Sequence, residues 1–397
     1  MDLKLKSIVE LDEKYYMNTF GKRKPVCFES GNGVKLKATD GKEYTDFMAG
    51  IAVNALGYGN KRLTDAIKNQ ADKLLHTSSL YYIENQAKLA CMLCENSFAD
   101  KAFFCNSGAE ANEGAIKLAR KYFYANGEDD KYEVISLMKS FHGRTLATVA
   151  ATGQEKYKKP YKPLPEGFIH VPKNDIAALK HAVTEKTCAV MLELIQGESG
   201  VVPLDKEYVK QVRQLCDEKG IILIIDEIQT GIGRTGKLFC YENYGITPDI
   251  MTLAKALGGG IPIGAVLAKD KYCAFKPGDH GTTFGGNPLA TGVACTVLDE
   301  IINGGVVKNA CVMGEYLKNS LSELAKKKKC IKEVRGIGLM VGIEFADENA
   351  PEYADKLFQK GFLVGTIGKS VFRLVPPLVI EKEDIDALIS AMDNILE

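Results

Sequence analysis

The feature that most constrains the fold is a run of five aliphatic residues at positions 221–225, which ends abruptly in Asp226. A run of this length and type predicts a strand that is buried on both faces, as in a parallel sheet covered by helices. A carboxylate at the end of such a strand is costly unless a cation meets it there. A second apolar stretch, residues 250–254, is followed by Lys255, so an acid and a base each follow a buried strand.

Polar side chains also follow three further predicted strands. These strands are expected at residues 102–105, 132–138 and 188–194, and the polar segments after them begin at Asn106, Phe141 and Gln196. Because the carboxyl ends of parallel strands meet at one edge of a sheet, we expect these groups to lie close to Asp226 and Lys255. The sequence therefore predicts an α/β fold with a ligand bound along one sheet edge.

The turn after residues 102–105 opens a predicted helix over residues 109–124. Ser107 and Gly108 stand where the first N–H groups of that helix have no partner within it, and a helix end of this kind binds phosphate. The alternative is that Ser107 only caps the helix. The residues alone leave both interpretations open.

Residues 231–236 match the G-x-G-x-x-G fingerprint of dinucleotide-binding proteins. That fingerprint should follow its strand directly, open a helix and precede an acidic residue about 20 positions further on. Here the strand ends several residues earlier, residues 237–244 show no helical apolar stripe, and residues 250–269 contain no acid. The context therefore argues against a dinucleotide site.

Composition excludes several other classes of function. The chain of 397 residues carries 51 basic and 51 acidic side chains, so a nucleic-acid partner is not indicated. No stretch approaches the ~18 apolar residues of a membrane span, and residues 1–6 are amphipathic without a signal-peptide core. Eleven cysteines without framework spacing predict reduced thiols in a cytoplasmic protein. Cys91 and Cys94 form a C-x-x-C pair without a second pair or a nearby histidine, so we expect no metal site there.

Three short segments resemble the signature of the class III (ω-amino acid) aminotransferases: DEIQTG at 226–231, GRTG at 233–236 and TLAK at 252–255. The resemblance extends over nearly the whole chain. It implies the fold-type I architecture of enzymes that use pyridoxal 5′-phosphate (PLP), with a large domain around a mostly parallel sheet and a smaller α+β domain. It also implies that Lys255 forms the Schiff base with the cofactor and that Asp226 pairs with the protonated pyridine nitrogen. Both roles suit a cofactor that acts as an electron sink.

The same resemblance assigns further roles to residues along the predicted sheet edge. It implies cofactor contacts for Ser107, Gly108, Ala109, Phe141, His142 and Gln229, with Phe141 flat on the cofactor ring. Thr283 would reach the cofactor phosphate of a partner subunit, which implies a homodimer with shared active sites. Substrate contacts are implied for Arg144, Glu198, Thr282 and Arg373.

Glu198 and Arg373 would together form a gate. By the resemblance, Arg144 holds the distal carboxylate of the amino donor, and Arg373 holds the second carboxylate that only glutamate has. With other donors Arg373 would be buried and unpaired, which typically costs ~3–5 kcal/mol. Glu198 would then pair with it and move aside for glutamate. The alternative is that both residues are ordinary surface charges.

The chain order suggests three parts. Residues 1–55 form an N-terminal segment, 56–294 the large PLP-binding domain and 295–397 the small C-terminal domain, with which the first part packs by resemblance. A helix is expected over residues 1–20 and a hairpin over residues 34–46. A long helix should run from about residue 295 towards the lysines at 326–329, and strands should follow at 331–335, 339–345, 362–366 and 371–375.

Residues 16–21 and the segment AGIAVNALG at 49–57 resemble the acetylornithine aminotransferases within the class, although Tyr58 stands where a histidine is usual. Gly50 leaves more room than the tyrosine that ornithine aminotransferases have near this position. The predicted reaction is transamination of N-acetylornithine with 2-oxoglutarate, giving N-acetylglutamate 5-semialdehyde and glutamate, in arginine biosynthesis. Ornithine, succinylornithine or 4-aminobutyrate transamination is the alternative, and a non-catalytic PLP-fold binding protein is a remote one.

Overall fold

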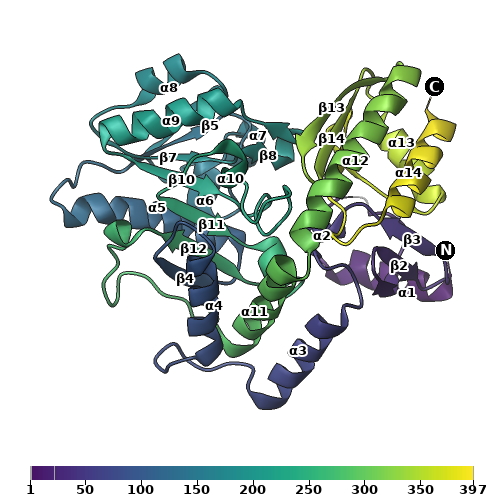
Figure 1. Ribbon diagram of the computed structural model, residues 1–397, viewed down its shortest axis with the longest axis horizontal. Helices are drawn as coiled ribbons and strands as arrows, with labels where there is room; N and C mark the ends of the chain where they lie inside the picture. Colours follow the sequence, from purple (N-terminus) through teal and green to yellow (C-terminus); the bar gives the residue numbers. More distant parts are fainter. Residues whose placement is uncertain (1, 22, 397) are drawn as a thin grey trace.

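The structure, a computed structural model, describes residues 2–21 and 23–396 of the chain (Figure 1). Figure 1 shows a large sheet with its helices on one side of the molecule and a smaller group of strands and helices on the other. The N-terminal strands lie beneath the smaller group, although they are far from it in sequence. This architecture is the predicted one: a large, mostly parallel α/β part and a smaller α+β part.

The large part is built on a seven-stranded sheet. Its strands lie in the order β4 (Lys101–Cys105), β12 (Gly264–Ala268), β11 (Ile250–Leu253), β10 (Ile222–Asp226), β7 (Thr187–Leu192), β5 (Glu133–Leu137) and β6 (Phe168–Val171). All are parallel except β12, which runs antiparallel to both of its neighbours. The carboxyl ends of β4, β5, β7, β10 and β11 therefore share one edge, as predicted.

β12, the strand between β4 and β11, was not predicted from the sequence. Three of its five residues are glycine or alanine, which are less common in strands than β-branched residues. Gly264 begins the strand because a Cβ at this position would lie 2.3 Å from the carbonyl oxygen of Ser107. The glycine thus allows β12 to pass close to the turn that ends β4.

Helices cover the large sheet. The helices between residues 49 and 244 are α2 (Ala49–Ala52), α3 (Lys61–Lys73), α4 (Glu84–Glu95), α5 (Gly108–Ala125), α6 (Leu146–Ala151), α7 (Glu155–Lys158), α8 (Ile176–Ala182), α9 (Lys206–Lys219) and α10 (Tyr241–Tyr244). Helix α9 buries Val209, Val212 and Leu215 at helical spacing and ends at Gly220, whose φ of +62° forms a left-handed cap. Short 3₁₀ turns η1 (Lys159–Tyr161), η2 (Gly197–Ser199), η3 (Lys255–Gly258) and η4 (Asp270–Tyr272) and the ribbon of β8 (Ile195–Gln196) and β9 (Val202–Pro203) complete this part.

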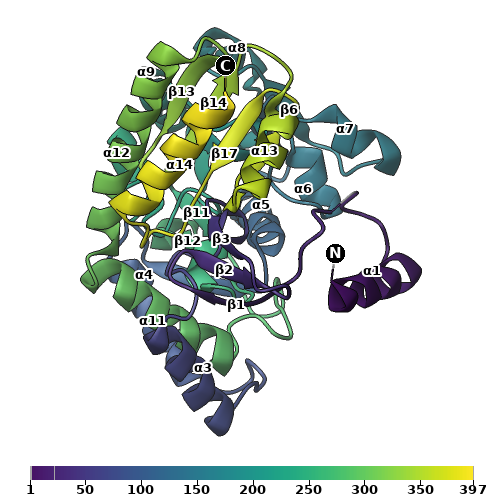
Figure 2. The same cartoon turned by 90° about the vertical axis from the view of Figure 1, so that its right-hand side faces the viewer.

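The smaller part contains a four-stranded antiparallel sheet of β13 (Ile331–Ile337), β14 (Met340–Phe345), β17 (Val371–Leu374) and β16 (Gly365–Ile367), in that order. Figure 2 shows α12 (Val306–Lys327), α14 (Lys382–Ile395) and α13 (Ala350–Gln359) side by side over this sheet. The C-terminal helix α14 was not predicted. Three of the four predicted strands are present close to their expected bounds.

The N-terminal segment joins the C-terminal one in a second four-stranded sheet. Its order is β1 (Phe28–Asn32), β2 (Lys35–Ala38), β3 (Glu43–Asp46) and β15 (Phe362–Leu363). β2 and β3 form the predicted hairpin, and β15 pairs with β3 in parallel. The strand expected at 362–366 is therefore wrong as a single element: its two halves, β15 and β16, belong to different sheets.

Two predicted helices differ from the structure. Residue 1 lies outside the described residues, and α1 (Leu3–Tyr15) ends at Tyr15 instead of near residue 20 because Tyr16 has an extended backbone. The predicted long helix after residue 295 is two helices, α11 (Pro288–Asn303) and α12, which meet at 61°. Gly305, with φ +75°, makes the break. Among the described residues no single helix is long and apolar enough to cross a membrane, and only this bent pair reaches the required length and composition.

The glycine pattern at 231–236 has a structural use. It forms a loop after β10 whose Arg234, 1% exposed, donates a hydrogen bond to the carbonyl oxygen of Leu339 at 3.0 Å, and the N–H of Leu339 donates to the Arg234 carbonyl at 3.0 Å. A Cβ on Gly338 would lie 2.5 Å from the backbone of Thr235. The loop therefore fixes the antiparallel sheet against the large one.

Candidate active site

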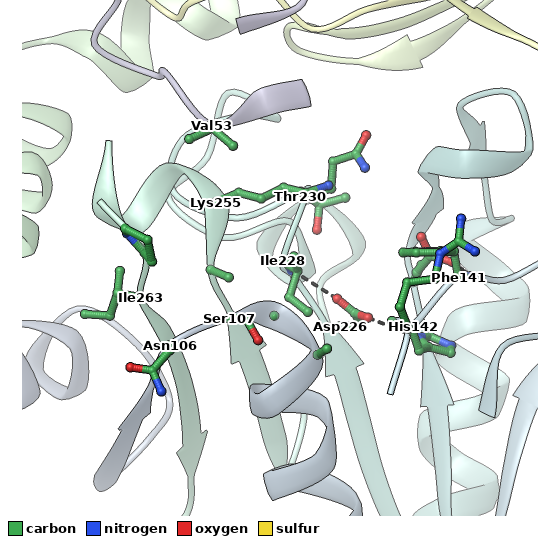
Figure 3. A pocket seen from close by; sticks show the side chains of 18 of the residues that line it. Val53, Asn106, Ser107, Phe141, His142, Asp226, Ile228, Thr230, Lys255 and Ile263 are labelled. Atoms are coloured by element: carbon green, nitrogen blue, oxygen red, sulfur yellow. Dashed lines mark hydrogen bonds and ion pairs between the residues drawn. The ribbon is translucent and has the colours of Figure 1, made fainter. Parts of the chain in front are cut away.

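Strand ends meet at one edge of the seven-stranded sheet, where a cavity of about 460 Å³ opens (Figure 3). This volume is typical of small-molecule sites. Asp226 at the end of β10 is level with Thr252 of β11, and Lys255 follows that strand. Segments beginning at Asn106 and Phe141 line the same cavity. Four of the five predicted polar segments thus contribute to one site, and β7 contributes Glu193 just beyond its end.

Lys255 lies in the cavity wall with a left-handed backbone at φ +42°. Burial lowers the pKa of its ammonium group to about 8, although the negative charge of Glu198 acts in the opposite direction. A neutral amine is the form that attacks a carbonyl carbon. Near neutral pH, Lys255 is therefore a better nucleophile than an ordinary lysine, whose pKa is about 10.4.

Asp226 is 4% exposed, and three donors hold its carboxylate. Oδ2 accepts hydrogen bonds from Nδ2 of Asn112 and Nδ1 of His142, each at 2.8 Å, and Oδ1 accepts one from the backbone N–H of Ile228 at 3.1 Å. Hydrogen bonds to a charged acceptor compensate for its desolvation. The carboxylate is therefore fixed in one orientation at the cavity wall, where Figure 3 shows it between Ile228 and His142.

Asn112 was not predicted as a site residue. It is fully buried on α5, and the hydroxyl of Thr252 donates to its Oδ1 at 2.8 Å, which leaves its Nδ2 to donate to Asp226. The sequence feature that could have identified Asn112 is an amide side chain on the otherwise apolar inward face of α5. His142 donates to the same oxygen of Asp226 as Asn112 does. Burial acts to lower the pKa of the His142 imidazole, but Asp226 outweighs that effect and raises it.

The N-terminus of α5 faces the same cavity. Oγ of Ser107 accepts a hydrogen bond from the N–H of Glu110 at 3.2 Å, so Ser107 does cap the helix. The N–H groups of Gly108 and Ala109 have no acceptor among the described residues. A Cβ on Gly108 would lie 2.8 Å from the side chain of Ile228, so only glycine fits here without a shift. Capping and an open anion-binding end therefore coexist.

Glu193 positions the loop that carries Phe141. It was expected within a strand, but β7 ends at Leu192 and Glu193 follows it. Its carboxylate accepts hydrogen bonds from the N–H of Phe141 at 2.8 Å and of Gly197 at 3.3 Å. Burial raises its pKa to about 7. Sequence reasoning assigned no role to this residue, because a single acid near a strand end has no distinctive spacing.

Arg144 lies in the same loop with its guanidinium exposed. The guanidinium carbon lies 3.9 Å from the ring centroid of Tyr157 and 5.5 Å from that of Phe141. No acid among residues 2–21 and 23–396 pairs with it. Arg144 lines the cavity and is available to an anion.

Glu198 in η2 and Arg373 on β17 form an ion pair across the two parts of the molecule. Arg373 is 5% exposed, and Oε1 of Gln229 lies 3.5 Å from its Nη1. Burial alone would raise the pKa of Glu198, but Arg373 outweighs that effect and lowers it. The pair therefore joins a buried arginine to a partly buried glutamate, and Arg373 is not an ordinary surface charge. Gln229 lies between this pair and the cavity, which it lines.

Thr282 and Thr283 lie elsewhere. They line a separate hollow of about 390 Å³ with Asn106 and Glu110, and Nδ2 of Asn106 donates to the hydroxyl of Thr282 at 3.0 Å. The chain itself does not bring Thr283 into the main cavity. Gly50 also lies outside the set of cavity-lining residues, which includes Val53.

Comparison with known proteins identifies the family. The family model "Aminotransferase class-III" matches residues 16–396. The chain belongs to the class-III aminotransferases. It is 51% identical over 389 residues to the acetylornithine aminotransferase of Caldanaerobacter subterraneus, covering 98% of this chain and 99% of that one. It is also 51% identical over 391 residues to that of Methanocaldococcus jannaschii, with 98% and 97% covered.

Solved structures of class-III aminotransferases share the whole fold. The acetylornithine aminotransferase of Elizabethkingia anophelis is 32% identical, with a TM-score of 0.89 and coverage of 99% of this chain and 98% of that one. The ornithine aminotransferase of Toxoplasma gondii is 31% identical, with a TM-score of 0.94 and coverage of 98% and 94%. The fold-type I architecture predicted from the sequence is confirmed.

Class-III aminotransferases use PLP, and the residues of this cavity fit that cofactor. The open N-terminus of α5 suits its phosphate, the hydrogen-bonded Asp226 suits a protonated ring nitrogen, and the amine of Lys255, with its lowered pKa, suits its aldehyde. All three line one cavity. Within the described part of the chain no group of three His, Cys, Asp or Glu side chains could hold a metal ion.

Proposed function

We propose that this aminotransferase transfers the distal amino group of N-acetylornithine to 2-oxoglutarate, as a step of arginine biosynthesis. The relatives that are 51% identical carry the name acetylornithine aminotransferase. The single observation in the structure that best supports the proposal is the ion pair of the buried Arg373 with Glu198, together with the guanidinium of Arg144, which meets no acid among the described residues. Two cations of which one is neutralised suit an enzyme that must accept both a monocarboxylate and a dicarboxylate.

The two donors differ at the reacting carbon. N-acetylornithine reacts at its distal amine and glutamate at its α-amine, and each has a carboxylate far from the reacting nitrogen, which we assign to Arg144. Glutamate alone has a second carboxylate next to the reacting carbon, which we assign to Arg373. Because Arg373 is buried, its unpaired state is costly, and Glu198 removes that cost when N-acetylornithine is bound.

Lys255 is the catalytic acid and base in this proposal. With the cofactor bound, Lys255 would hold its aldehyde, and the lysine amine would take and give the proton at the substrate carbon. Its pKa of about 8 gives it a larger fraction of neutral, basic amine near neutral pH than an ordinary lysine has. Asp226 keeps the ring nitrogen protonated, and bound PLP then supplies an electron sink for the electrons left on the substrate carbon.

Ser107, Gly108 and Ala109 are the proposed phosphate site, and Phe141 the proposed ring-stacking residue. His142 acts through Asp226, to which its Nδ1 donates. Gln229 is proposed as a cofactor contact because it lines the cavity. Thr282 is proposed as a substrate contact.

We also propose a homodimer in which Thr283 serves the partner's cofactor phosphate. Exposed apolar side chains near Thr283 support this: Leu75 is 54%, Leu80 86%, Tyr81 68% and Phe284 61% exposed. The segments of Leu75 and Phe284 lie together, since the N–H of Leu289 donates to the Leu75 carbonyl and the ring centroid of His76 lies 5.3 Å from that of Phe284. Apolar patches of this kind mark protein interfaces. The cysteines of the described chain are reduced thiols, which supports a reducing compartment such as the cytoplasm.

The test is a donor panel with the purified holoenzyme and 2-oxoglutarate as acceptor. We expect kcat/KM to be highest for N-acetylornithine, above ornithine, N-succinylornithine and 4-aminobutyrate. Lys255→Ala should fold but lose turnover by about 10³-fold or more, because it removes both the nucleophile and the base. A higher kcat/KM for another donor would refute the substrate assignment, and no turnover with any donor would favour the non-catalytic alternative.

A further inference from the structure

The planar face and the N–H edge of the Arg144 guanidinium lie in different environments. Its guanidinium carbon lies 3.9 Å from the Tyr157 ring centroid, whereas its N–H groups meet no acid among the described residues. A planar guanidinium can stack on an aromatic face and at the same time bind a carboxylate through two N–H groups along its edge. Tyr157 therefore occupies the face of Arg144 and leaves the edge for a ligand.

Tyr157 is itself held in position relative to the active-site loop. It lies on α7, and its N–H donates to the carbonyl of Gln154 at 3.1 Å. The amide of Gln154 donates to the carbonyl of Ser140 at 3.1 Å, directly before Phe141. The rings of Phe141 and Tyr157 meet edge to face, with centroids 5.8 Å apart. α7 and the Arg144 loop are thus joined by a hydrogen bond and by ring contacts.

The hydroxyl of Tyr157 forms no hydrogen bond within the described part of the chain. The ring is therefore the part of the side chain that acts on Arg144. Lys156 lies 4.7 Å from the same centroid, so the ring faces a second cation as well. Electrostatic attraction between a cation and the ring quadrupole does not require the hydroxyl, and phenylalanine retains it.

We propose that Tyr157 is a specificity-determining positioning residue that orients the guanidinium of Arg144 towards the distal carboxylate of the amino donor. The inference rests on the proposed role of Arg144. It adds the residue that orients the Arg144 side chain before the substrate binds. A long, flexible side chain loses rotamer freedom when it binds a ligand, and prior stacking reduces that loss. Without the Tyr157 ring, the Arg144 side chain samples more rotamers in solvent and therefore binds the carboxylate more weakly.

The test compares two amine donors of equal length in the holoenzyme. 5-Aminopentanoate has a distal carboxylate, and n-pentylamine lacks it. Tyr157→Leu should raise KM for 5-aminopentanoate by about 2- to 30-fold, with kcat little changed, and should leave pentylamine unaffected. Tyr157→Phe should have the wild-type KM for 5-aminopentanoate, and Tyr157→Met should raise this KM as Tyr157→Leu does. Tyr161→Leu, an exposed ring on the adjacent turn without a cation partner, is the matched control and should change neither donor.

A second measurement does not depend on turnover. The dissociation constant of glutarate, obtained by calorimetry, should rise by a similar factor in Tyr157→Leu and not in Tyr157→Phe. Equal losses for both amines, or an unchanged glutarate affinity, would overturn the inference. Arg144→Gln distinguishes a failure of the role proposed for Tyr157 from a failure of the role proposed for Arg144. If it abolishes the preference for 5-aminopentanoate while Tyr157→Leu does not, only the role of Tyr157 fails. If it leaves the preference intact, the assignment of Arg144 fails as well.

Discussion

At Lys255 the decisive influence on protonation is burial, which lowers the pKa of the amine to about 8 against the attraction of Glu198. In the cofactor-free protein, the neutral fraction therefore rises through pH 8. We predict that the rate of covalent PLP attachment increases with pH up to about 8–9 and then levels off. Stopped-flow absorbance of cofactor-free protein mixed with PLP measures this rate.

The control for that profile is Glu198→Ala. Because the negative charge of Glu198 raises the pKa of Lys255, its removal should shift the midpoint of the profile to lower pH. A rate that continues to rise up to pH 10 would show that Lys255 titrates like an ordinary lysine.

Glu198 also permits a prediction about donor choice. Glu198→Ala leaves Arg373 buried and unpaired, which is costly until a carboxylate arrives. Glutamate supplies that carboxylate and N-acetylornithine does not, so kcat/KM for glutamate relative to N-acetylornithine should rise by about 10-fold or more. Single-turnover measurements with each donor give the ratio. Glu333→Ala, which removes an exposed partner of Arg335, should leave the ratio unchanged, and an unchanged ratio in Glu198→Ala would exclude the gate.

Single residues differed in how well the sequence predicted them. Lys255 and Asp226 could be found because each follows a buried apolar run, a pattern with a clear physical cost. Asn112 and Glu193 could not, because their roles depend on which side chains the fold brings to them. The ion pair of Glu198 and Arg373 joins residues 175 positions apart, and no local pattern connects them.

At the scale of elements, α2 is a left-handed turn in which Ala49, Gly50, Ile51 and Ala52 all have positive φ, between 49° and 65°. Left-handed backbone costs roughly 1–2 kcal/mol for each non-glycine residue, so other contacts must compensate. Asp46 supplies them: it is 1% exposed, and its carboxylate accepts hydrogen bonds from the N–H of Met48 at 2.7 Å and of Ala49 at 2.9 Å. The turn leads directly to Val53 in the cavity wall.

Tyr58 donates its hydroxyl hydrogen to Oδ2 of Asp46 at 2.6 Å. We predict that Tyr58→Phe destabilises the protein by about 1.5–3 kcal/mol, since it removes a donor from a buried carboxylate. Denaturant unfolding of the two proteins measures the difference. The matched control is Tyr208→Phe, because the buried Tyr208 hydroxyl has no partner among the described residues and its loss should be neutral. Equal effects of both substitutions would contradict this role for Tyr58.

Strands were predictable where large aliphatic residues dominate the pattern. The apolar runs that became β7, β10 and β11 were found, whereas β12, in which three of five residues are glycine or alanine, was not. The break between α11 and α12 has two adjacent glycines as its signal, but apolar spacing on both sides suggested one helix. α2 could not be predicted, because three of its four residues rarely adopt positive φ.

At the scale of the whole molecule, fold and family followed from the order of strands and motifs, but assembly did not. A chain that folds as one unit carries no direct record of which face meets a second copy. The hollow that contains Thr283 is separate from the cavity of Lys255, and exposed apolar side chains lie near it. Both observations agree with a site completed by a neighbouring subunit.

Hybrid dimers provide the test of shared sites. Lys255→Ala and Thr283→Asp should each be inactive alone, the second because its carboxylate repels the cofactor phosphate. If Thr283 serves the partner, a hybrid of the two variants has one site with both defects and one site with neither, because the two subunits of a symmetric dimer exchange equivalent residues. After full exchange of an equal mixture, half of the dimers are hybrids, so about one quarter of wild-type activity should return. The control is each variant alone, taken through the same exchange. If Thr283 instead acts within its own chain, every site in the hybrid has one defect and the mixture stays inactive.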